Sequence, residues 1–575
     1  MTHQQRFKQP VVDSDDGDGQ RGRDSVIIEY DVPSVMRDGV TLRANIFRPN
    51  TAGQYPTVLV RTPYDKNVQQ PEMDPALWAR RGFQVIIQDT RGRFASEGRW
   101  EPFLFEAQDG YDSVEWAASL PTSNGAVGMA GASYCGNVQW LAAGAQPPPL
   151  AAIAPTFSWS DARDGLLSRG GALELGLALY WAVENGFDVI ARSVKSEVEA
   201  DSRGELLRRE WDQLAERGYW ELPVNDVAIL RRHGIPTLTG IRPIDDDRVA
   251  DVSTVEHRNV TVPVFHTGGW YDIFLGGTLR NFTAMRALGH QSRLMVGPWS
   301  HDVHRDPIGQ RRFGMLASMD GAPSHPQGDW TEAQCDWFSA HLAPEEVESQ
   351  EAAPIRIFVM GRNYWRDEQE WPPERAIRQR WYLLPDGDLR PKTPLDADAD
   401  VEFEYDPARP VPTIGGHGVP VNDYTAGPFD QTAIESRGDV LVFSSAPLVA
   451  DLEVTGEIRV VLWASSSAPS TDWVARLCDV HPDGRSFNIC DGICRADAAD
   501  GWRRYEIDLW ATSNVFLAGH RLRVHVTSSS FPRWDRNLNT GNQLRAEYHV
   551  AAQRIGVGGA RASYLDLPVI EQDSA

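Results

Sequence analysis

The sequence predicts an α/β domain with a mainly parallel sheet, interrupted by a helical insertion and followed by an antiparallel β-sandwich or jelly roll. Three observations predict this fold. Apolar runs alternate with helical periodicity up to residue 157, charged helical periodicity follows to residue 255, and alternating strands dominate after residue 343. A chain of 575 residues is also long enough to need more than one core, so several domains are expected.

Strands and helices alternate in the first region. The runs Tyr55-Arg61 and Gln84-Asp89 are largely apolar, as in strands buried on both faces of a parallel sheet. Helical periodicity appears at Gly110-Leu120, and a turn at Asp38-Gly39 joins two earlier strands. The expected elements are strands at 26–33, 41–49, 55–61, 84–89, 127–130 and 152–155, and helices at 77–81, at 110–120 and from residue 134.

The alternation stops after residue 157 and resumes after residue 255. The intervening chain is mostly helical and charged, for example at Ser196-Arg217, and such insertions between strands commonly form active-site lids. Strands return at 262–268 and 293–297, around a helix at 277–288. The later strands are expected at 355–360, 380–384, 439–443, 457–464, 472–479 and 521–529.

These patterns give the expected domain organisation. It comprises a disordered tail (1–24), the first part of the α/β domain (25–157), a helical cap (158–255), the second part of the α/β domain (256–343) and a jelly-roll domain (344–575).

The chain is strongly acidic, with 56 Lys and Arg against 80 Asp and Glu and a net charge of −24. Such a surface repels nucleic acid and anionic membranes, so neither is an expected partner. The N-terminal tail lacks an apolar signal segment, and no run approaches the length of a membrane span. Five scattered cysteines form no disulfide framework. These features predict a cytoplasmic protein and leave open whether it forms a homo-oligomer.

The segment G-A-S-Y-C-G at 131–136 has the pattern of a nucleophile elbow, and it lies between an expected strand and an expected helix. Serine on such a sharp turn needs small neighbours, which Gly131 and Gly136 provide. The turn exposes the hydroxyl of Ser133 and directs the backbone N–H of Tyr134 at an oxyanion. The pattern therefore predicts Ser133 as a nucleophile in an α/β-hydrolase sheet.

A serine nucleophile needs a base and an acid that orients the base. In α/β-hydrolases the acid comes first and the histidine second, each just after a strand. Asp272 follows the strand at 262–268, and His301 follows the strand at 293–297, so both fit. His304 is a rival base one turn further on. His266, inside a strand, is better explained as a core residue, and the acidic run at 245–247 as a solvated loop.

Tyr64 directly follows the strand Tyr55-Arg61, within R-T-P-Y-D-K at 61–66. This is the position from which α/β-hydrolases supply the second oxyanion donor. The Tyr64 hydroxyl could replace the usual backbone N–H there. The alternative is a buried tyrosine in a turn, and spacing alone does not decide between them.

These motifs resemble those of the cocaine esterase and X-prolyl dipeptidyl-peptidase family of serine hydrolases. The matching segments run along almost the whole chain, in an order and spacing that make the set specific. They are R-T-P-Y-D-K at 61–66, Q-D-T-R-G-R-F-A-S-E-G at 88–98, G-A-S-Y-C-G at 131–136, G-G-W-Y-D at 268–272, G-P-W-S-H at 297–301, P-I-R-I-F-V-M-G at 354–361 and S-S-S-F-P-R-W-D-R-N at 528–537.

The resemblance implies an α/β-hydrolase domain, a helical cap and a C-terminal jelly roll. It implies a triad of Ser133, Asp272 and His301, with an oxyanion hole formed by the Tyr64 hydroxyl and the Tyr134 N–H. Phe274 and Trp181 look like the aromatic residues that line the acyl pocket in the esterase branch, although ordinary packing would equally explain both.

The chain departs from one branch of this family. Enzymes that hydrolyse α-amino acid esters carry acidic residues just after the triad aspartate, where this chain has Ile273, Phe274 and Leu275. X-prolyl peptidases are usually longer, with an extra N-terminal domain. An apolar or aromatic acyl group is therefore the expected substrate feature.

The expected function is hydrolysis of a small-molecule ester or amide through an acyl-enzyme, without a metal or organic cofactor. Alternatives are an amide-directed acylase, an X-prolyl or dipeptidyl peptidase, and an acyltransferase that uses the same acyl-enzyme. A binding protein with a vestigial triad is the alternative from a different class.

Overall fold

A computed structural model describes most of the chain. The described residues are 25–68, 73–236, 248–322, 325–343, 353–391, 396–421, 424–497, 501–542 and 545–571. The expected disordered tail (1–24) and the acidic run at 245–247 therefore lie outside the described residues.

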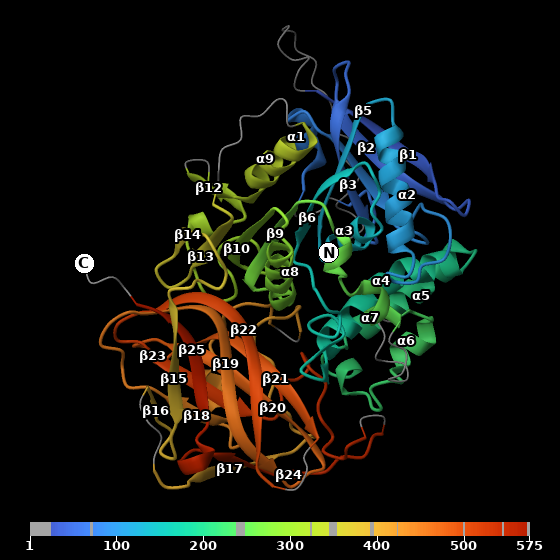
Figure 1. Cartoon of the computed structure of the whole chain (residues 1–575). Coiled ribbons are helices and arrows are strands. Elements are labelled where there is room, and N and C mark those ends of the chain that lie inside the picture. The colour runs from blue at the N-terminus through green and yellow to red at the C-terminus, as the bar shows by residue number, and fades with distance from the viewer. Residues whose placement is uncertain are drawn as a thin grey trace.

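A ten-stranded mixed sheet forms the upper part of the molecule in Figure 1. Its central strands, from β4 and β3 to β13, pair in parallel, whereas β1, β2 and β14 pair antiparallel at the two edges. This confirms the predicted mainly parallel sheet. In spatial order the strands are β1 Val26–Val35, β2 Thr41–Pro49, β4 Gln84–Asp89, β3 Tyr55–Thr62, β5 Ser123–Ala132, β6 Leu150–Thr156, β9 Val264–Tyr271, β10 Ser292–Ser300, β13 Ile355–Val359 and β14 Tyr364–Glu368.

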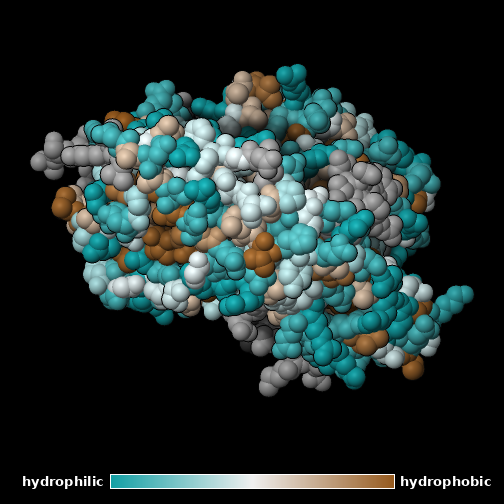
Figure 2. Space-filling model, turned by 90° about the horizontal axis from the view of Figure 1, so that it is seen from below, coloured by the Kyte–Doolittle hydropathy of each residue, from teal (hydrophilic) through white to brown (hydrophobic). Residues whose placement is uncertain are grey.

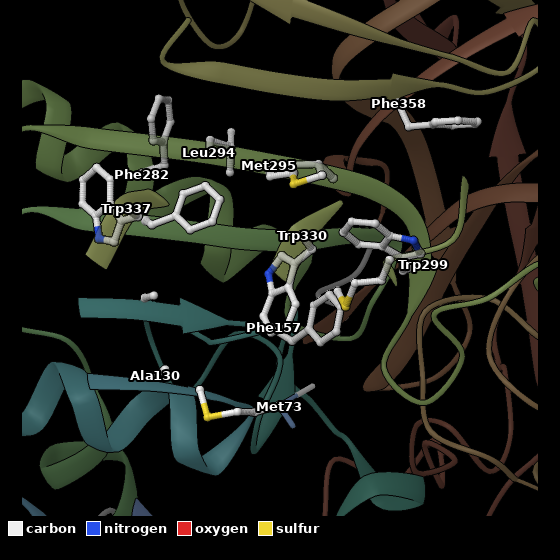
Figure 3. Packing of buried hydrophobic residues seen from close by; sticks show 14 of the residues in the cluster. Met73, Ala130, Phe157, Phe282, Leu294, Met295, Trp299, Trp330, Trp337 and Phe358 are labelled. Carbon is white, nitrogen blue, oxygen red and sulfur yellow. The ribbon is translucent and has the colours of Figure 1, made fainter. Parts of the chain in front are cut away.

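Helices cover both faces of this sheet. On one face α1 and α9 pack together, with the rings of Trp78 and Phe338 5.8 Å apart. On the other face, Val114 of α2 and Trp140 of α3 belong to a second core with the sheet. Figure 3 shows part of the core to which Trp78 and Phe338 belong, and this core also contains Trp330 and Phe157. These helices are α1 Pro75–Arg80, α2 Glu106–Ser119, α3 Tyr134–Gly144, α8 Leu275–Ala287 and α9 Trp330–Leu342.

The insertion between β6 and β9 is mainly helical, as predicted. Its helices lie to one side of the sheet in Figure 1, below α3, and their apolar side chains form a separate core around Leu179 and Leu207. None of the described helices is long and apolar enough to cross a membrane. The cap elements are the hairpin β7 Ser168–Arg169 and β8 Ala172–Leu173, followed by α4 Leu175–Ser193, α5 Glu197–Trp211, α6 Ala228–His233 and α7 Arg248–Ser253.

One strand lies in a different place from the one predicted. The segment at 355–360 was expected in the C-terminal β domain, but β13 pairs in parallel with β10 and extends the large sheet. Its residues Ile355, Ile357 and Phe358 are fully buried, as a strand covered on both faces requires. Strand β14 turns back antiparallel along β13 and closes the sheet. The expected boundary at residue 344 therefore falls before two strands of the α/β sheet.

The C-terminal region is β-rich and antiparallel, in agreement with the predicted class. One seven-stranded sheet contains β15, β16, β17, β19, β22, β24 and β25, and a four-stranded sheet contains β18, β20, β21 and β23. The bounds are β15 Ala376–Leu383, β16 Leu389–Arg390, β17 Asp400–Tyr405, β18 Leu441–Ser444, β19 Leu452–Ser466, β20 Ser470–Val480, β21 Ser486–Asp497, β22 Arg503–Phe516, β23 Arg521–Thr527, β24 Ala551–Gly556 and β25 Tyr564–Ile570.

Candidate active site

Ser133 stands at the junction of β5 and α3, with backbone angles of φ 59° and ψ −121°. A positive φ is uncommon for a residue with a side chain, and such strain often marks a functional site. Gly131 has φ +129°, and a Cβ there would lie 2.6 Å from the Cys135 Cβ. A Cβ on Gly136 would lie 2.8 Å from the carbonyl oxygen of Thr156. Both glycines are therefore needed for the close approach of strand and helix at this turn.

The backbone N–H of Tyr134 lies at the first position of α3, where an N–H has no acceptor inside the helix. A helix N-terminus also favours negative charge. The side chain of Tyr134 is anchored separately. Its hydroxyl donates to Glu106 Oε1 at 2.8 Å, and its ring stacks on Phe103 with centroids 4.2 Å apart. These contacts fix the start of the helix next to Ser133.

Asp272 and His301 follow the neighbouring parallel strands β9 and β10, and the structure brings their side chains together. His301 Nδ1 lies 2.7 Å from Asp272 Oδ1. The other carboxylate oxygen accepts the N–H of Phe274 at 2.8 Å. The Asp272 side chain is fully buried, whereas the His301 side chain is 14% exposed. The carboxylate therefore holds the imidazole through its Nδ1 nitrogen.

The rival histidines have other contacts. The Nε2 of His304 lies 3.0 Å from the carbonyl oxygen of His301, and burial lowers the pKa of His304 to about 4. Burial lowers the pKa of His266 to about 3, and its ring packs between Trp140 and Phe282. His266 is therefore a neutral core residue.

Tyr64 lies beside the elbow, with its ring 6.4 Å from that of Tyr134 in an edge-to-face arrangement. Its hydroxyl accepts a hydrogen bond from Trp181 Nε1 at 2.9 Å. Burial raises the pKa of Tyr64 well above its usual range, against the opposite effect of hydrogen bonds with Trp181 and Ser133. The phenol therefore keeps its proton and lies next to the serine side chain.

The two residues expected in the acyl pocket both contact other site residues. Trp181 is 7% exposed and lies over Tyr134, with the rings nearly parallel and their centroids 6.3 Å apart. Phe274 is 1% exposed, with its ring 5.2 Å from that of His301 and 4.9 Å from that of Trp159. Phe274 is thus a packing partner of His301.

Several further residues near the site are not among the candidates that the sequence predicts. Trp100 packs on Trp181, and the buried Arg93 lies over the Trp100 ring at 4.2 Å. Glu184 of α4 and Asp302 reach solvent but are enclosed by protein on most sides, and this burial raises the pKa of both carboxyls, that of Glu184 to about 7. Of these residues, only Arg93 belongs to a sequence segment singled out above, at 88–98.

One group of described side chains has the spacing of metal ligands. The ligand atoms of Asp479, His481 and His520 lie within 4.8 Å of one another. Arg311 Nη1 lies 2.9 Å from His481 Nε2, so this nitrogen accepts a hydrogen bond from a guanidinium. A fixed positive charge beside the group and the use of a ligand lone pair both argue against a cation there.

Two family models match the chain. The X-Pro dipeptidyl-peptidase (S15 family) model matches residues 38–302, and the X-Pro dipeptidyl-peptidase C-terminal non-catalytic domain model matches residues 348–566. A cocaine esterase from Rhodococcus sp. is 35% identical over 96% of this chain and 100% of its own length. A putative serine esterase from Mycobacterium tuberculosis is 25% identical over 93% of this chain and 94% of its own.

Solved structures share the fold along almost the whole chain. An α-amino acid ester hydrolase superposes with a TM-score of 0.74 over 98% of this chain and 99% of its own, at 24% identity. An aminopeptidase from the marine sediment archaeon Thaumarchaeota archaeon gives 0.73 over 99% of this chain and 100% of its own, also at 24% identity. These similarities concern the arrangement of the sheet, the cap and the C-terminal β region.

Proposed function

Because the chain belongs to the cocaine esterase and X-Pro dipeptidyl-peptidase family of serine hydrolases, we propose that it hydrolyses carboxylic esters with Ser133 as nucleophile. His301 is the general base and Asp272 the acid that orients it. The observation that carries this proposal is the 2.7 Å contact between His301 and Asp272, at the ends of two adjacent strands of the sheet that carries Ser133.

The reaction proceeds in two steps through an acyl-enzyme. His301 takes the proton of Ser133 as the serine oxygen attacks the ester carbonyl. The imidazolium stays next to the buried Asp272 carboxylate and then gives its proton to the leaving alcohol. Water, activated by His301, attacks the acyl-enzyme and releases the acid. His301 is the base in both steps, so its hydrogen bond with Asp272 supports acylation and deacylation alike.

The oxyanion of each tetrahedral intermediate is stabilised by two donors, the backbone N–H of Tyr134 and the hydroxyl of Tyr64. A donor of this kind contributes about 3 kcal/mol in other hydrolases. The neutral state of Tyr64 supports the assignment, since burial raises its pKa and keeps the proton on the phenol oxygen.

Aromatic side chains support an apolar or aromatic acyl group. Trp100, Trp159, Trp181 and Phe274 belong to one buried cluster around Tyr134. The residues after Asp272 are apolar and buried, and none of them pairs with a substrate ammonium in the way that acidic residues at this position would.

A substrate panel tests the proposed function. Wild type and Ser133→Ala are assayed with aryl and alkyl esters of apolar acids and of amino acids, and with the matching amides. Ser119→Ala, at the exposed end of α2, serves as control. We expect turnover of the apolar acyl esters in the wild type and the control but not in Ser133→Ala. Turnover of amides or free α-amino substrates alone would assign an acylase or a peptidase instead. Esters formed from added alcohols would assign an acyltransferase.

A further inference from the structure

The hydrogen bond between Trp181 and Tyr64 has a fixed direction. An indole N–H is only a donor, so the Tyr64 oxygen is the acceptor at 2.9 Å. The proton of the phenol is therefore not used in this contact and has to be donated elsewhere. The Trp181 N–H occupies one lone pair of the oxygen and restricts the directions in which the hydroxyl proton can point.

The indole ring is held in place from two sides. It lies nearly parallel to the Tyr134 ring, at an interplanar angle of 11°, and it is tilted by 46° over Trp100 with centroids 5.4 Å apart. Trp181 thus contacts both residues of the oxyanion hole, Tyr64 through its N–H and Tyr134 through its ring face.

A buried arginine ties the same part of α4 to the loop of Tyr64. Arg93 Nε donates to the carbonyl oxygen of Pro63 at 2.7 Å, directly before Tyr64. Its Nη2 donates to Asn185 Oδ1 at 2.9 Å, and Asn185 in turn donates to the carbonyl oxygen of Trp181 at 2.9 Å. Arg93 is 2% exposed, so these hydrogen bonds form without competition from water. The distance between the Trp181 turn and the Tyr64 loop is therefore fixed by this guanidinium.

We propose that Trp181 is a positioning residue of the oxyanion hole, whose indole N–H aims the Tyr64 hydroxyl proton at the developing oxyanion. This inference rests on the proposed function, because it requires Tyr64 to be an oxyanion donor. It assigns to a cap residue a role in transition-state stabilisation that the expected role in lining the acyl pocket does not include. It also makes the hole dependent on the cap, since one of its two donors is oriented from α4.

A double-mutant cycle tests the proposal. Trp181→Phe keeps an aromatic ring but removes the N–H, and Tyr64→Phe removes the hydroxyl that it orients. With p-nitrophenyl benzoate, we expect Trp181→Phe to lower kcat about tenfold, the factor of a typical hydrogen bond, and to change KM less than about twofold. In the Tyr64→Phe background the same substitution should leave kcat unchanged, because the oriented hydroxyl is already absent. Trp211→Phe in α5, which packs on Tyr180 and Phe187, is the matched control.

A second readout separates orientation from pocket lining. The affinity for phenylboronic acid, which forms a tetrahedral adduct, should fall in Trp181→Phe by the same factor as kcat/KM, whereas the affinity for benzoate should stay within about twofold. A higher KM with unchanged kcat, or equal losses in both Tyr64 backgrounds, would overturn the role of Trp181 while leaving the proposed function intact. An unchanged kcat in Tyr64→Phe would show that Tyr64 is not an oxyanion donor. It would overturn the role of Tyr64 and, with it, the role of Trp181.

Discussion

At the scale of single residues, the strained turn at Ser133 depends on glycine at 131. An added methyl group there would meet the Cys135 Cβ at 2.6 Å, on a backbone with φ +129°. We expect Gly131→Ala to lose at least tenfold in kcat/KM and about 1–3 kcal/mol of stability. Gly144→Ala is the control, since nothing lies within 4 Å of a Cβ there. Steady-state kinetics and thermal unfolding measure both, and a Gly131→Ala enzyme equal to wild type would show that the turn is not strained.

A second prediction at this scale concerns the pH profile. Burial raises the pKa of Glu184 to about 7, and its carboxyl interacts with the charge of His301. Above pH 7 the ionised carboxylate stabilises the imidazolium of His301, so it opposes loss of the His301 proton. In Glu184→Gln this effect is absent. The acidic limb of kcat/KM should therefore shift to lower pH, whereas Glu199→Gln on the exposed face of α5 should leave it in place. A profile unchanged in Glu184→Gln would show that Glu184 does not influence the base.

The difference between what was predictable and what was not is clear at this scale. The positions of Ser133, Asp272 and His301 follow from local pattern and chain order, because each comes at the end of one of the parallel strands of the same sheet. The contact of Trp181 with Tyr64 joins residues 117 positions apart and depends on how α4 is rotated about its own axis. No periodicity in the sequence encodes that rotation. The contact was therefore not predictable, and the family resemblance indicated only that Trp181 lines the acyl pocket.

At the scale of elements, β13 shows where sequence patterns are ambiguous. A short apolar run followed by a turn is compatible with a central strand of a parallel sheet and with a strand of a sandwich core. The choice depends on its partner, and the partner of β13 is β10, which the local sequence does not reveal. The cap helices were easier to predict, because their charged periodicity contrasts with the apolar strands on either side.

A buried ionic group joins the cap to the C-terminal region. Glu174, just before α4, accepts a hydrogen bond from Trp534 Nε1 at 2.8 Å and lies 3.7 Å from Arg533. Arg533 is also paired with Asp491 of β21 at 2.6 Å. These side chains are at most 3% exposed. Removing one partner of such a pair leaves a buried charge, which typically costs several kcal/mol.

Stability should respond to the titration of Glu174. Burial raises its pKa from 4.5 to about 7, so the folded state holds this proton more tightly than the unfolded state. That stabilisation is complete below about pH 4.5 and is lost as the pH rises through about 7. Between pH 6 and pH 8 the wild type should lose about 1 kcal/mol of stability relative to Glu174→Gln. Melting temperatures at both pH values measure this difference. A constant difference would mean that Glu174 keeps one protonation state throughout.

At the scale of the whole molecule, the cap is attached to the C-terminal region as well as to the sheet. The backbone N–H of Leu173 donates to Asp535 Oδ1 at 2.7 Å, and the backbone N–H of Arg495 donates to the carbonyl oxygen of Gly170 at 2.6 Å. A Cβ on Gly170 would lie 1.9 Å from the carbonyl oxygen of Ile493. The hairpin β7–β8 and β21 are thus in direct backbone contact, and the C-terminal region supports the helix that carries Trp181.

The overall charge gives a prediction about substrates. The chain carries a net charge of −24, and the face seen in Figure 2 is mostly hydrophilic, with hydrophobic residues in scattered patches. A negative field attracts cations, and salt screens it. For a pair of benzoate esters that differ only in a cationic or neutral alcohol, we expect kcat/KM of the cationic ester to fall severalfold between 10 and 500 mM salt. The neutral ester should change little. Equal salt dependence of the two would show that the field does not act on substrate encounter.

The most direct test of the mechanism is to identify the residue that becomes acylated. The wild type, Ser133→Ala and Ser119→Ala are each mixed with a fluorophosphonate and with p-nitrophenyl benzoate, quenched, digested and analysed by mass spectrometry. The account predicts one adduct on the peptide that contains Ser133 in the wild type and in Ser119→Ala, a burst of one p-nitrophenol per chain if deacylation is the slower step, and no adduct in Ser133→Ala. An adduct on another residue, or full labelling of Ser133→Ala, would contradict it.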